Sequence, residues 1–532
     1  MVTAASLGSR LSLMVVLLTH AGLGQDPVTP PAPPRQEPKP QEPQRPPAPQ
    51  GQEPQVPVDA EAERRGAPIR DVTLGDVLRI GVANNVRLRA AELVPQQARL
   101  DVLFAEAGFE PELYGSTGYL DSESPTRNAF SPSVSRTVID AEVGWRQRVI
   151  TGGLFDLAYR PARFETAGAA AFPEKQFTSE WEASFRQPLL RGAWTDYNLA
   201  QVTAARYGLS QARHTFDQAV QDTLLEIVVA YWELVFAREN WRVLQSALAV
   251  AEEQLRITGE RIRVNQLAPR DRVADEAEVA RGKEALIVAE NQIRAREDDL
   301  RRLVFDATKP ELWKMNFRPV AEMNVVPPAA EQPFEPIVDI ALANRPDVRS
   351  QRSAVAIAEV ALLEAERDAL PALDLVTAWS SDGVREDINA AFRDSLDQQY
   401  PDWSVRLEFA IPIGNHQARA RSNRAQLEVE RQRRLLHAIT LDVTKDVREA
   451  VRNMYSLGQS VVASSESVRL AESNLETEQV KLRVGASTNF EVQRRNQALR
   501  EARSRLLRNQ LDFRVAESRL LHAQGLLQAT VE

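Results

Sequence analysis

The sequence contains one long unit twice, and this duplication restricts the folds that the chain can adopt. The segment 80–85, Ile-Gly-Val-Ala-Asn-Asn, reappears at 340–345 as Ile-Ala-Leu-Ala-Asn-Arg, an offset of 260 positions. Later, Arg263-Val264-Asn265 reappears as Arg483-Val484-Gly485, at an offset of 220. A unit repeated across roughly 450 residues predicts two copies of one structural motif. Because the offset falls by 40 between these pairs, the first copy carries about 40 additional residues after Pro111.

The N-terminal region predicts an export signal followed by a tether. Arg10 precedes an apolar run at 11–18, and small residues follow before Gln25, which is the pattern of a cleaved signal peptide at 1–24. From 25 to 68 the chain is rich in proline, glutamine and glutamate. Such a segment cannot bury enough apolar surface to fold, so we expect a disordered, Pro-rich tether at 25–68.

Composition and motif content exclude several classes of function. The chain has no cysteine, so disulfides, thiolate metal sites and a cysteine nucleophile are not available. Its formal net charge is −9, whereas a nucleic-acid-binding protein would show a basic patch or stripe. The histidines outside the signal have no metal-ligand spacing, and the sequence has neither a Gly-rich phosphate loop nor an H-E-x-x-H run. We therefore expect no enzyme, no catalytic residue, no metal site and no cofactor.

Heptad patterns predict long helices that pack in narrow seams. A large residue recurs every seven positions from Trp241 to Ile262, with small residues between, and the same pattern runs from Val461 to Leu482. Large residues alternating with small ones are typical of coiled coils. The predicted long helices are 196–264, 270–305, 416–484 and 490–526.

Each pair of long helices turns back at a short tip. Asn265 or Gly485 can end the preceding helix in the left-handed conformation, Pro269 suits the first turn of the next helix, and Thr488 can cap it. The pattern alone equally fits plain helical hairpins whose acids are ordinary caps. The candidate functional residues at these tips are Asn265, Arg270, Asp271, Gly485, Thr488, Glu491 and Arg494.

Six further segments alternate apolar and polar residues with a period of two, which predicts β-strands. Their length and their aromatic residues are typical of strands in a transmembrane β-barrel. An ordinary half-buried antiparallel sheet would show the same alternation, but the export signal favours the membrane. The segments are 113–120, 139–145, 155–159, 181–185, 373–379 and 404–411.

These segments divide the exported chain into two repeats joined by a Pro-rich connector at 311–334. The first repeat, 69–310, holds a helix, strands within 113–187 and a long helical hairpin at 196–305. The second repeat, 335–527, holds a helix, a β-hairpin at 372–411 and a long helical hairpin at 416–526.

Across roughly residues 70–527 the chain resembles TolC-like outer-membrane efflux proteins. The resemblance depends on several motifs in order: the duplicated Ala-Asn helix, Gln-Pro-Leu-Leu-Arg-Gly at 187–192, Ala-Tyr-Trp-Glu-Leu at 230–234, and Arg-Val-Gly-Ala-Ser-Thr-Asn-Phe-Glu-Val at 483–492. The second copy enters its long helix through Ile-Pro-Ile-Gly at 411–414 in the same way. Each motif is weak alone, but their ordered and duplicated occurrence is specific.

The resemblance implies an α+β membrane protein that assembles as a homotrimer. Each protomer would contribute strands to one shared transmembrane antiparallel β-barrel and helices to one periplasmic α-helical coiled-coil barrel. The trimer would contact outer-membrane lipid, dock onto a periplasmic adaptor (membrane fusion) protein and work with an inner-membrane pump. It would serve as the passive exit duct of a tripartite efflux or type I secretion system, in the outer membrane and with a large periplasmic portion.

The resemblance also assigns roles to the tips, with some departures. The family's aperture acids fall on Asp271 and Glu491, where an acid ring would attract cations. Arg494 stands where some members have a second acid, Ser487 replaces a latching arginine, and Asn265 replaces a glycine.

The additional residues of the first copy include a predicted hairpin at 137–160. The sequence leaves open whether this hairpin joins the shared barrel or lies outside it. It also leaves a second function open, because a non-conducting periplasmic coiled-coil scaffold protein would show the same heptads.

Overall fold

The computed structural model describes most of the two repeats. The predicted signal peptide, the tether, Asn265 and part of the connector lie outside the described residues. The described residues are 69–124, 134–167, 174–264, 268–305, 313, 316–321 and 325–530 of the 532-residue chain.

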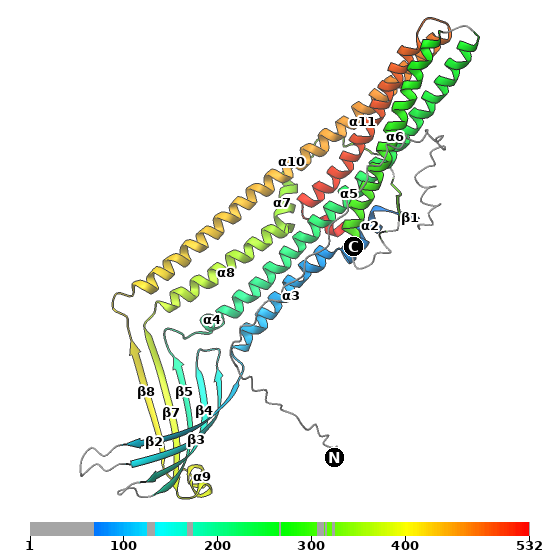
Figure 1. Ribbon diagram of the computed structural model, residues 1–532. Coiled ribbons are helices and arrows are strands. Elements are labelled where there is room, and N and C mark those ends of the chain that lie inside the picture. The colour runs from blue at the N-terminus through cyan, green and yellow to red at the C-terminus, as the bar shows by residue number, and fades with distance from the viewer. Residues whose placement is uncertain are drawn as a thin grey trace, which may run out of the picture. The chain divides into compact units, whose positions relative to one another are not determined.

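Six strands form one antiparallel sheet in the order β2-β3-β4-β5-β7-β8 (Figure 1). The first repeat contributes four of these strands and the second repeat two. Strands occur at all six segments where the sequence alternates, and the fold therefore confirms the predicted combination of long helices with an antiparallel sheet. The bounds are β2 (Glu112–Ser124), β3 (Val134–Arg148), β4 (Leu154–Ala167), β5 (Lys175–Pro188), β7 (Ala372–Arg385) and β8 (Pro401–Ala410).

The two faces of the sheet differ in chemistry, because directly paired residues share a face and neighbours along a strand do not. One face carries apolar side chains, as in the row of direct partners Trp145, Leu157, Ala183 and Trp379. The opposite face carries ion pairs: the Arg160 guanidinium lies 2.9 Å from a Glu142 carboxylate oxygen on β3 and also contacts Glu182 on β5. Arg146–Asp156 (2.8 Å) and Arg186–Asp374 (3.1 Å) add two more cross-strand pairs.

The helices form two long hairpins and two shorter helical segments that precede the sheet strands (Figure 1). The 64 residues of α5 span about 96 Å at 1.5 Å per residue. Among the described residues, no helix has both the length and the apolar character needed to cross a membrane. The helices are α2 (Leu74–Asn84), α3 (Val86–Ala107), α4 (Thr195–Asn198), α5 (Ala200–Arg263), α6 (Pro269–Val304), α7 (Glu335–Asn344), α8 (Pro346–Asp368), α9 (Ile388–Leu396), α10 (His416–Arg483) and α11 (Asn489–Ala523), with a short 3-10 turn at Leu527–Thr530.

The largest hydrophobic core lies where α2, α5 and α6 meet the two-stranded parallel sheet of β1 (Ile69–Val72) and β6 (Asn316–Pro319). Leu224, Ile227 and Leu300 are completely buried there. The buried Tyr231 hydroxyl donates a hydrogen bond to the Val320 carbonyl (3.1 Å), which satisfies its polar end. A second core, around Val447, joins α7, α10 and α11.

The duplicated Ala-Asn motif marks the junction of two helices in each repeat. In the first repeat, the buried Asn85 caps α3 by accepting from the Leu88 amide (3.1 Å), and its side-chain amide donates to the Leu303 carbonyl (2.8 Å). In the second repeat, Arg345 occupies the equivalent position and its guanidinium donates to Asp446 on α10 (3.0 Å). Both residues therefore connect the short helices to a long hairpin, by different chemistry.

The burial pattern of α10 confirms the predicted heptad register. Between positions 461 and 482, every residue outside the register is exposed. The buried and half-buried residues are Val461, Ser464, Val468, Ala471, Leu475, Glu478 and Leu482. The register thus includes a carboxylate, Glu478, in the last turns of the helix.

Candidate functional site

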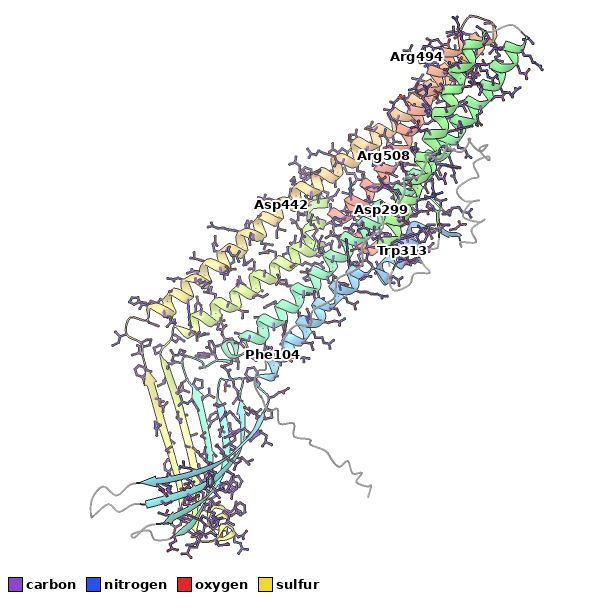
Figure 2. All side chains as sticks on the ribbon, in the orientation of Figure 1. Phe104, Asp299, Trp313, Asp442, Arg494 and Arg508 are labelled. Carbon is purple, nitrogen blue, oxygen red and sulfur yellow. The ribbon has the colours of Figure 1, made fainter. Side chains whose placement is uncertain are left out.

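The tips of the two helical hairpins lie at the end of the helices that is remote from the sheet, where Figure 2 labels Arg494. The second tip begins with a helix-terminating motif at Gly485. This glycine has a φ of +78°, and its amide donates to the Leu482 carbonyl (3.2 Å). The Ala486 amide donates to the Lys481 carbonyl (2.8 Å). These two bonds form a Schellman motif, which satisfies the last carbonyls of α10 and turns the chain sharply.

Thr488 begins α11 at the second tip, as the sequence predicts. Its Oγ1 accepts a hydrogen bond from the Glu491 amide (3.4 Å). The Glu491 carboxylate lies in the first turn, where the helix dipole favours negative charge. Arg494 is exposed, and its guanidinium lies 3.9 Å from Glu491, so the predicted aperture acid has a basic neighbour one turn further on.

Ser487 fixes the second tip to the helix that precedes it. Its hydroxyl donates a hydrogen bond to the Glu478 carboxylate, and the Lys481 ammonium lies 3.7 Å from the same group. The Ser487 hydrogen bond is the main cause that lowers the pKa of Glu478, and the positive charges of Lys481 and Arg495 lower it further. Ser487, which stands where some members of the resembled family have a latching arginine, therefore has a partner of its own within this tip.

The first tip is described from Ala268 onward. Pro269 occupies the first turn of α6, as predicted, where the missing amide hydrogen is not needed. Arg270 is exposed. Asn265 lies outside the described residues, and the side chain of Asp271 is likewise not described.

A cleft of about 580 Å³ separates the two tips. Arg270 borders this cleft from the first tip, and Gly485 and Thr488 border it from the second. The structure thus brings together three of the predicted tip residues. Glu491 and Arg494 are not among the residues that line the cleft.

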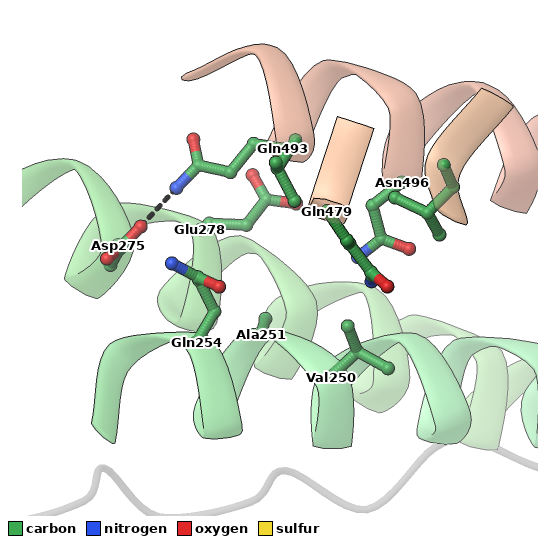
Figure 3. A pocket seen from close by; sticks show the side chains of 10 residues that line it. Val250, Ala251, Gln254, Asp275, Glu278, Gln479, Gln493 and Asn496 are labelled. Carbon is green, nitrogen blue, oxygen red and sulfur yellow. Dashed lines mark hydrogen bonds between the residues drawn. The ribbon is translucent and has the colours of Figure 1, made fainter. Parts of the chain in front are cut away.

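Two polar contacts from the start of α11 join the second hairpin to the first, and the sequence did not single them out. The Asn489 side-chain amide donates to the Thr258 hydroxyl on α5 (3.0 Å). One turn later, the Gln493 side-chain amide donates to the Asp275 carboxylate on α6, as the dashed line in Figure 3 marks. Thr258 is completely buried and Asp275 is 2% exposed.

The helical spacing of α6 contains a signal that could have identified Asp275. Seven-residue steps lead back from the buried Ala289 through Gly282 to Asp275. A carboxylate at the end of such a series predicts a buried polar contact. In α10, Glu478 ends the seven-residue series of Ser464 and Ala471 in the same way.

Beside Asp275, polar side chains from four helices line a small cavity (Figure 3). Gln254, Glu278, Gln479 and Asn496 contribute amide and carboxylate groups. Glu278 is paired with the Arg281 guanidinium (2.6 Å) and lies 3.6 Å from that of Arg500. In the described part of the chain, no three His, Asp or Glu side chains are placed to hold a metal ion. The arrangement therefore connects helices of the two hairpins.

The fold, with its antiparallel sheet and long helical hairpins, is shared with solved outer-membrane channels. The CmeC outer membrane channel of Campylobacter jejuni superposes with a TM-score of 0.61 at 15% identity, over 85% of this chain and 86% of that one. The outer membrane protein VceC of Vibrio cholerae superposes with a TM-score of 0.62 at 14% identity, over 85% of this chain and 96% of that one.

Sequence comparisons show which family the chain resembles. Residues 337–526 match the family described as "Outer membrane efflux protein". The alkaline protease secretion protein AprF of Pseudomonas aeruginosa is 23% identical over 352 residues, which are 65% of this chain and 69% of that protein. Together these matches confirm the predicted resemblance to the TolC-like outer-membrane efflux proteins and the predicted location in the outer membrane with a large periplasmic portion.

Proposed function

We propose that the protein is a passive exit duct, the outer-membrane channel of a tripartite efflux or type I secretion system. Three copies would close their sheets into one transmembrane barrel and continue it with their helical hairpins as a periplasmic tunnel. An inner-membrane pump and a periplasmic adaptor protein would supply the energy and the connection. The name of AprF refers to protease secretion, which supports a polypeptide as one class of cargo.

The observation that carries this proposal is the two-faced sheet. Its apolar face suits lipid, and its opposite face holds the ion pairs around Arg160, which suit a water-filled lumen. Both outer strands are free to pair with another copy: nine of the ten residues of β8 are exposed, including Trp403 on the apolar face and Arg406 on the polar face. An isolated sheet with these properties would expose unpaired backbone groups to lipid, whereas a closed sheet satisfies them.

The helical tips support the second part of the proposal, the periplasmic entrance. We infer that Asn265, Arg270 and Asp271 from the first tip meet Gly485, Thr488, Glu491 and Arg494 from the second tip at the entrance and at the adaptor contact. The cleft between the tips supports this inference, because it gives an adaptor a concave surface bordered by residues of both hairpins. The exposed Phe490 at its rim adds an apolar contact.

Ion conductance in planar lipid bilayers tests the duct. The purified trimer should conduct in discrete steps, with a preference for cations that the acids at the entrance produce. A trimer that inserts into the bilayer and never conducts would instead indicate a non-conducting coiled-coil scaffold.

The Asp271→Ala/Glu491→Ala double variant tests the role of the tip acids in the same assay. It should lose part of the cation preference or conduct more often, because two negative charges per protomer are removed from the entrance. The Glu260→Ala/Glu476→Ala variant is a matched control, since it removes two exposed acids from the same helical hairpins. Equal selectivity in both variants would leave Asp271 and Glu491 as ordinary helix caps.

A further inference from the structure

The additional hairpin of the first repeat is an integral part of the sheet. Strands β3 and β4 lie between β2 and β5, with twelve directly paired residues between β3 and β4 and twelve between β4 and β5. β3 also pairs with β2 along the whole length of β2, from Glu112 opposite Arg146 to Ser124 opposite Val134. Removing this hairpin from the sheet would therefore break two complete ladders of backbone hydrogen bonds.

The turn between β3 and β4 is fixed to the junction of the sheet and the helices. The Arg148 guanidinium donates to the Asn198 side-chain carbonyl in α4 (3.0 Å), and the Gln187 side-chain amide donates to the Thr151 carbonyl (2.9 Å). Gly152 adopts a φ of +85°, and a Cβ at this position would lie 2.2 Å from the Gly192 carbonyl oxygen. The turn thus fits closely against the segment that leads from β5 into α5.

We propose that the closed sheet of the trimer contains eighteen strands, six from each protomer, and that β8 of one protomer pairs with β2 of the next. This inference rests on the proposed trimeric duct and specifies the wall of its outer-membrane part. The partner of each free edge is a second copy of this chain.

Strand direction supports this pairing. Neighbouring strands are antiparallel throughout the sheet, so the first and the last of its six strands run in opposite directions. Pairing β8 with β2 of another copy continues the antiparallel order without a break. One additional strand would have made the two edge strands of a protomer run in the same direction. The additional pair, β3 and β4, keeps the two edge strands antiparallel.

The chemistry of the two edges supports the same pairing. On β8 the apolar face carries Trp403, Val405, Leu407 and Phe409, and on β2 it carries Leu113 and Tyr119; all of these side chains are mostly exposed in a single copy. A shift of one residue would put the apolar side chains of one strand on the polar face of its neighbour. The faces therefore allow only registers in which odd-numbered residues of β2 lie opposite odd-numbered residues of β8.

The additional strands make the exit wider. With strands 4.8 Å apart and tilted by about 40°, eighteen strands enclose a ring of about 36 Å between backbones, against about 24 Å for twelve strands. The number of helices that enter the sheet does not change, because β3 and β4 end in their own turn and join no helix. The exit would thus be about 1.5 times as wide as a sheet of four strands per protomer allows.

Disulfide cross-linking in the assembled full-length chain tests the pairing directly, because the chain has no cysteine of its own. Val405→Cys in β8 is combined with one cysteine at a time in β2. Odd-numbered positions should give covalent trimers in at least one register, since paired residues bring their Cα atoms within disulfide range. The odd positions are Leu113, Gly115, Thr117, Tyr119, Asp121 and Glu123, and the controls on the opposite face are Tyr114, Ser116, Gly118, Leu120 and Ser122.

Electron microscopy of a hairpin deletion provides the second test. Deleting residues 134–167 joins β2 to β5, which keeps the antiparallel order, and should narrow the ring of the trimer about 1.5-fold. The inference would be overturned if the trimer of the original chain had the narrow ring, or if no odd position of β2 formed a cross-link in it. Either result would still be compatible with a trimeric duct. A chain that forms no trimer would overturn the duct itself. If the deletion variant does not assemble, the cross-linking result decides.

Discussion

The hydrogen bond between Gln493 and Asp275 provides the sharpest test of how the two hairpins are held together near the tips. Replacing Gln493 by leucine keeps the size of the side chain and removes the donor, so the Asp275 carboxylate, which is 2% exposed, loses its partner on α11. A hydrogen bond to a charged group contributes about 1.5–3 kcal/mol, and a buried group left without its partner also loses solvation. We therefore expect the local opening free energy of α11 to fall by at least this amount.

Hydrogen–deuterium exchange of the detergent-solubilised protein measures this loss. At about 1.4 kcal/mol per tenfold change, amides 493–499 should exchange about 10 to 150 times faster in Gln493→Leu than in the original chain. Gln497→Leu is the matched control, because Gln497 lies one turn further along the same helix, is exposed and donates to Glu501 of its own helix (3.0 Å). If both variants exchange at the original rate, the hydrogen bond between Gln493 and Asp275 does not stabilise α11.

Three further substitutions test the helix terminus at Gly485, the buried ion pairs of Glu297 and the lowered pKa of Glu478. Gly485→Ala forces an alanine into a φ of +78°, and this backbone strain should destabilise the tip by about 1–2 kcal/mol. Limited proteolysis should therefore cleave the tip faster in the variant. Cleavage at an unchanged rate would argue against strain at this position. Glu297→Gln replaces a carboxylate that is 6% exposed and accepts from two arginine guanidinium groups by a neutral amide. It should lower the free energy of unfolding in guanidinium by about 3–5 kcal/mol, because two buried cations lose their counter-charge. The control Glu290→Gln, from a surface pair, should cost less than about 1 kcal/mol. The pKa of Glu478 is lowered below 4.5, so its carboxylate stabilises the tip above that pH and loses this effect as the pH falls through its folded pKa. Ser487→Ala should therefore move the loss of amide protection at the tip to a higher pH. An unchanged midpoint would contradict the hydrogen bond from Ser487 as the main cause of the lowered pKa.

Periodicity made much of the fold predictable. The alternation in 373–379 predicts β7 and that in 404–411 predicts β8, because the two faces of each strand meet different environments. The heptads of α10 predict its buried face as far as Leu482 for the same reason. Local chemistry also predicted the left-handed residue at Gly485 and the cap at Thr488.

Contacts between separate elements could not be predicted in this way. Gln493 and Asp275 belong to different repeats, and a heptad register specifies a face without naming the helix that covers it. The helix α9, inserted between β7 and β8, was not expected either: its Ser395 hydroxyl lies 2.8 Å from that of Ser179 on β5, a contact between residues 216 positions apart. The position of β3 and β4 inside the sheet likewise depends on which ladder they join, and alternation alone does not contain this information.

In the proposed duct three copies of the chain share one sheet, so the mass of the detergent-solubilised full-length protein is the most direct measurement. Native mass spectrometry should give three times the mass of a single chain, and it should do so only when detergent is present. A monomer or dimer that stays soluble without detergent would contradict the shared sheet, and with it the channel.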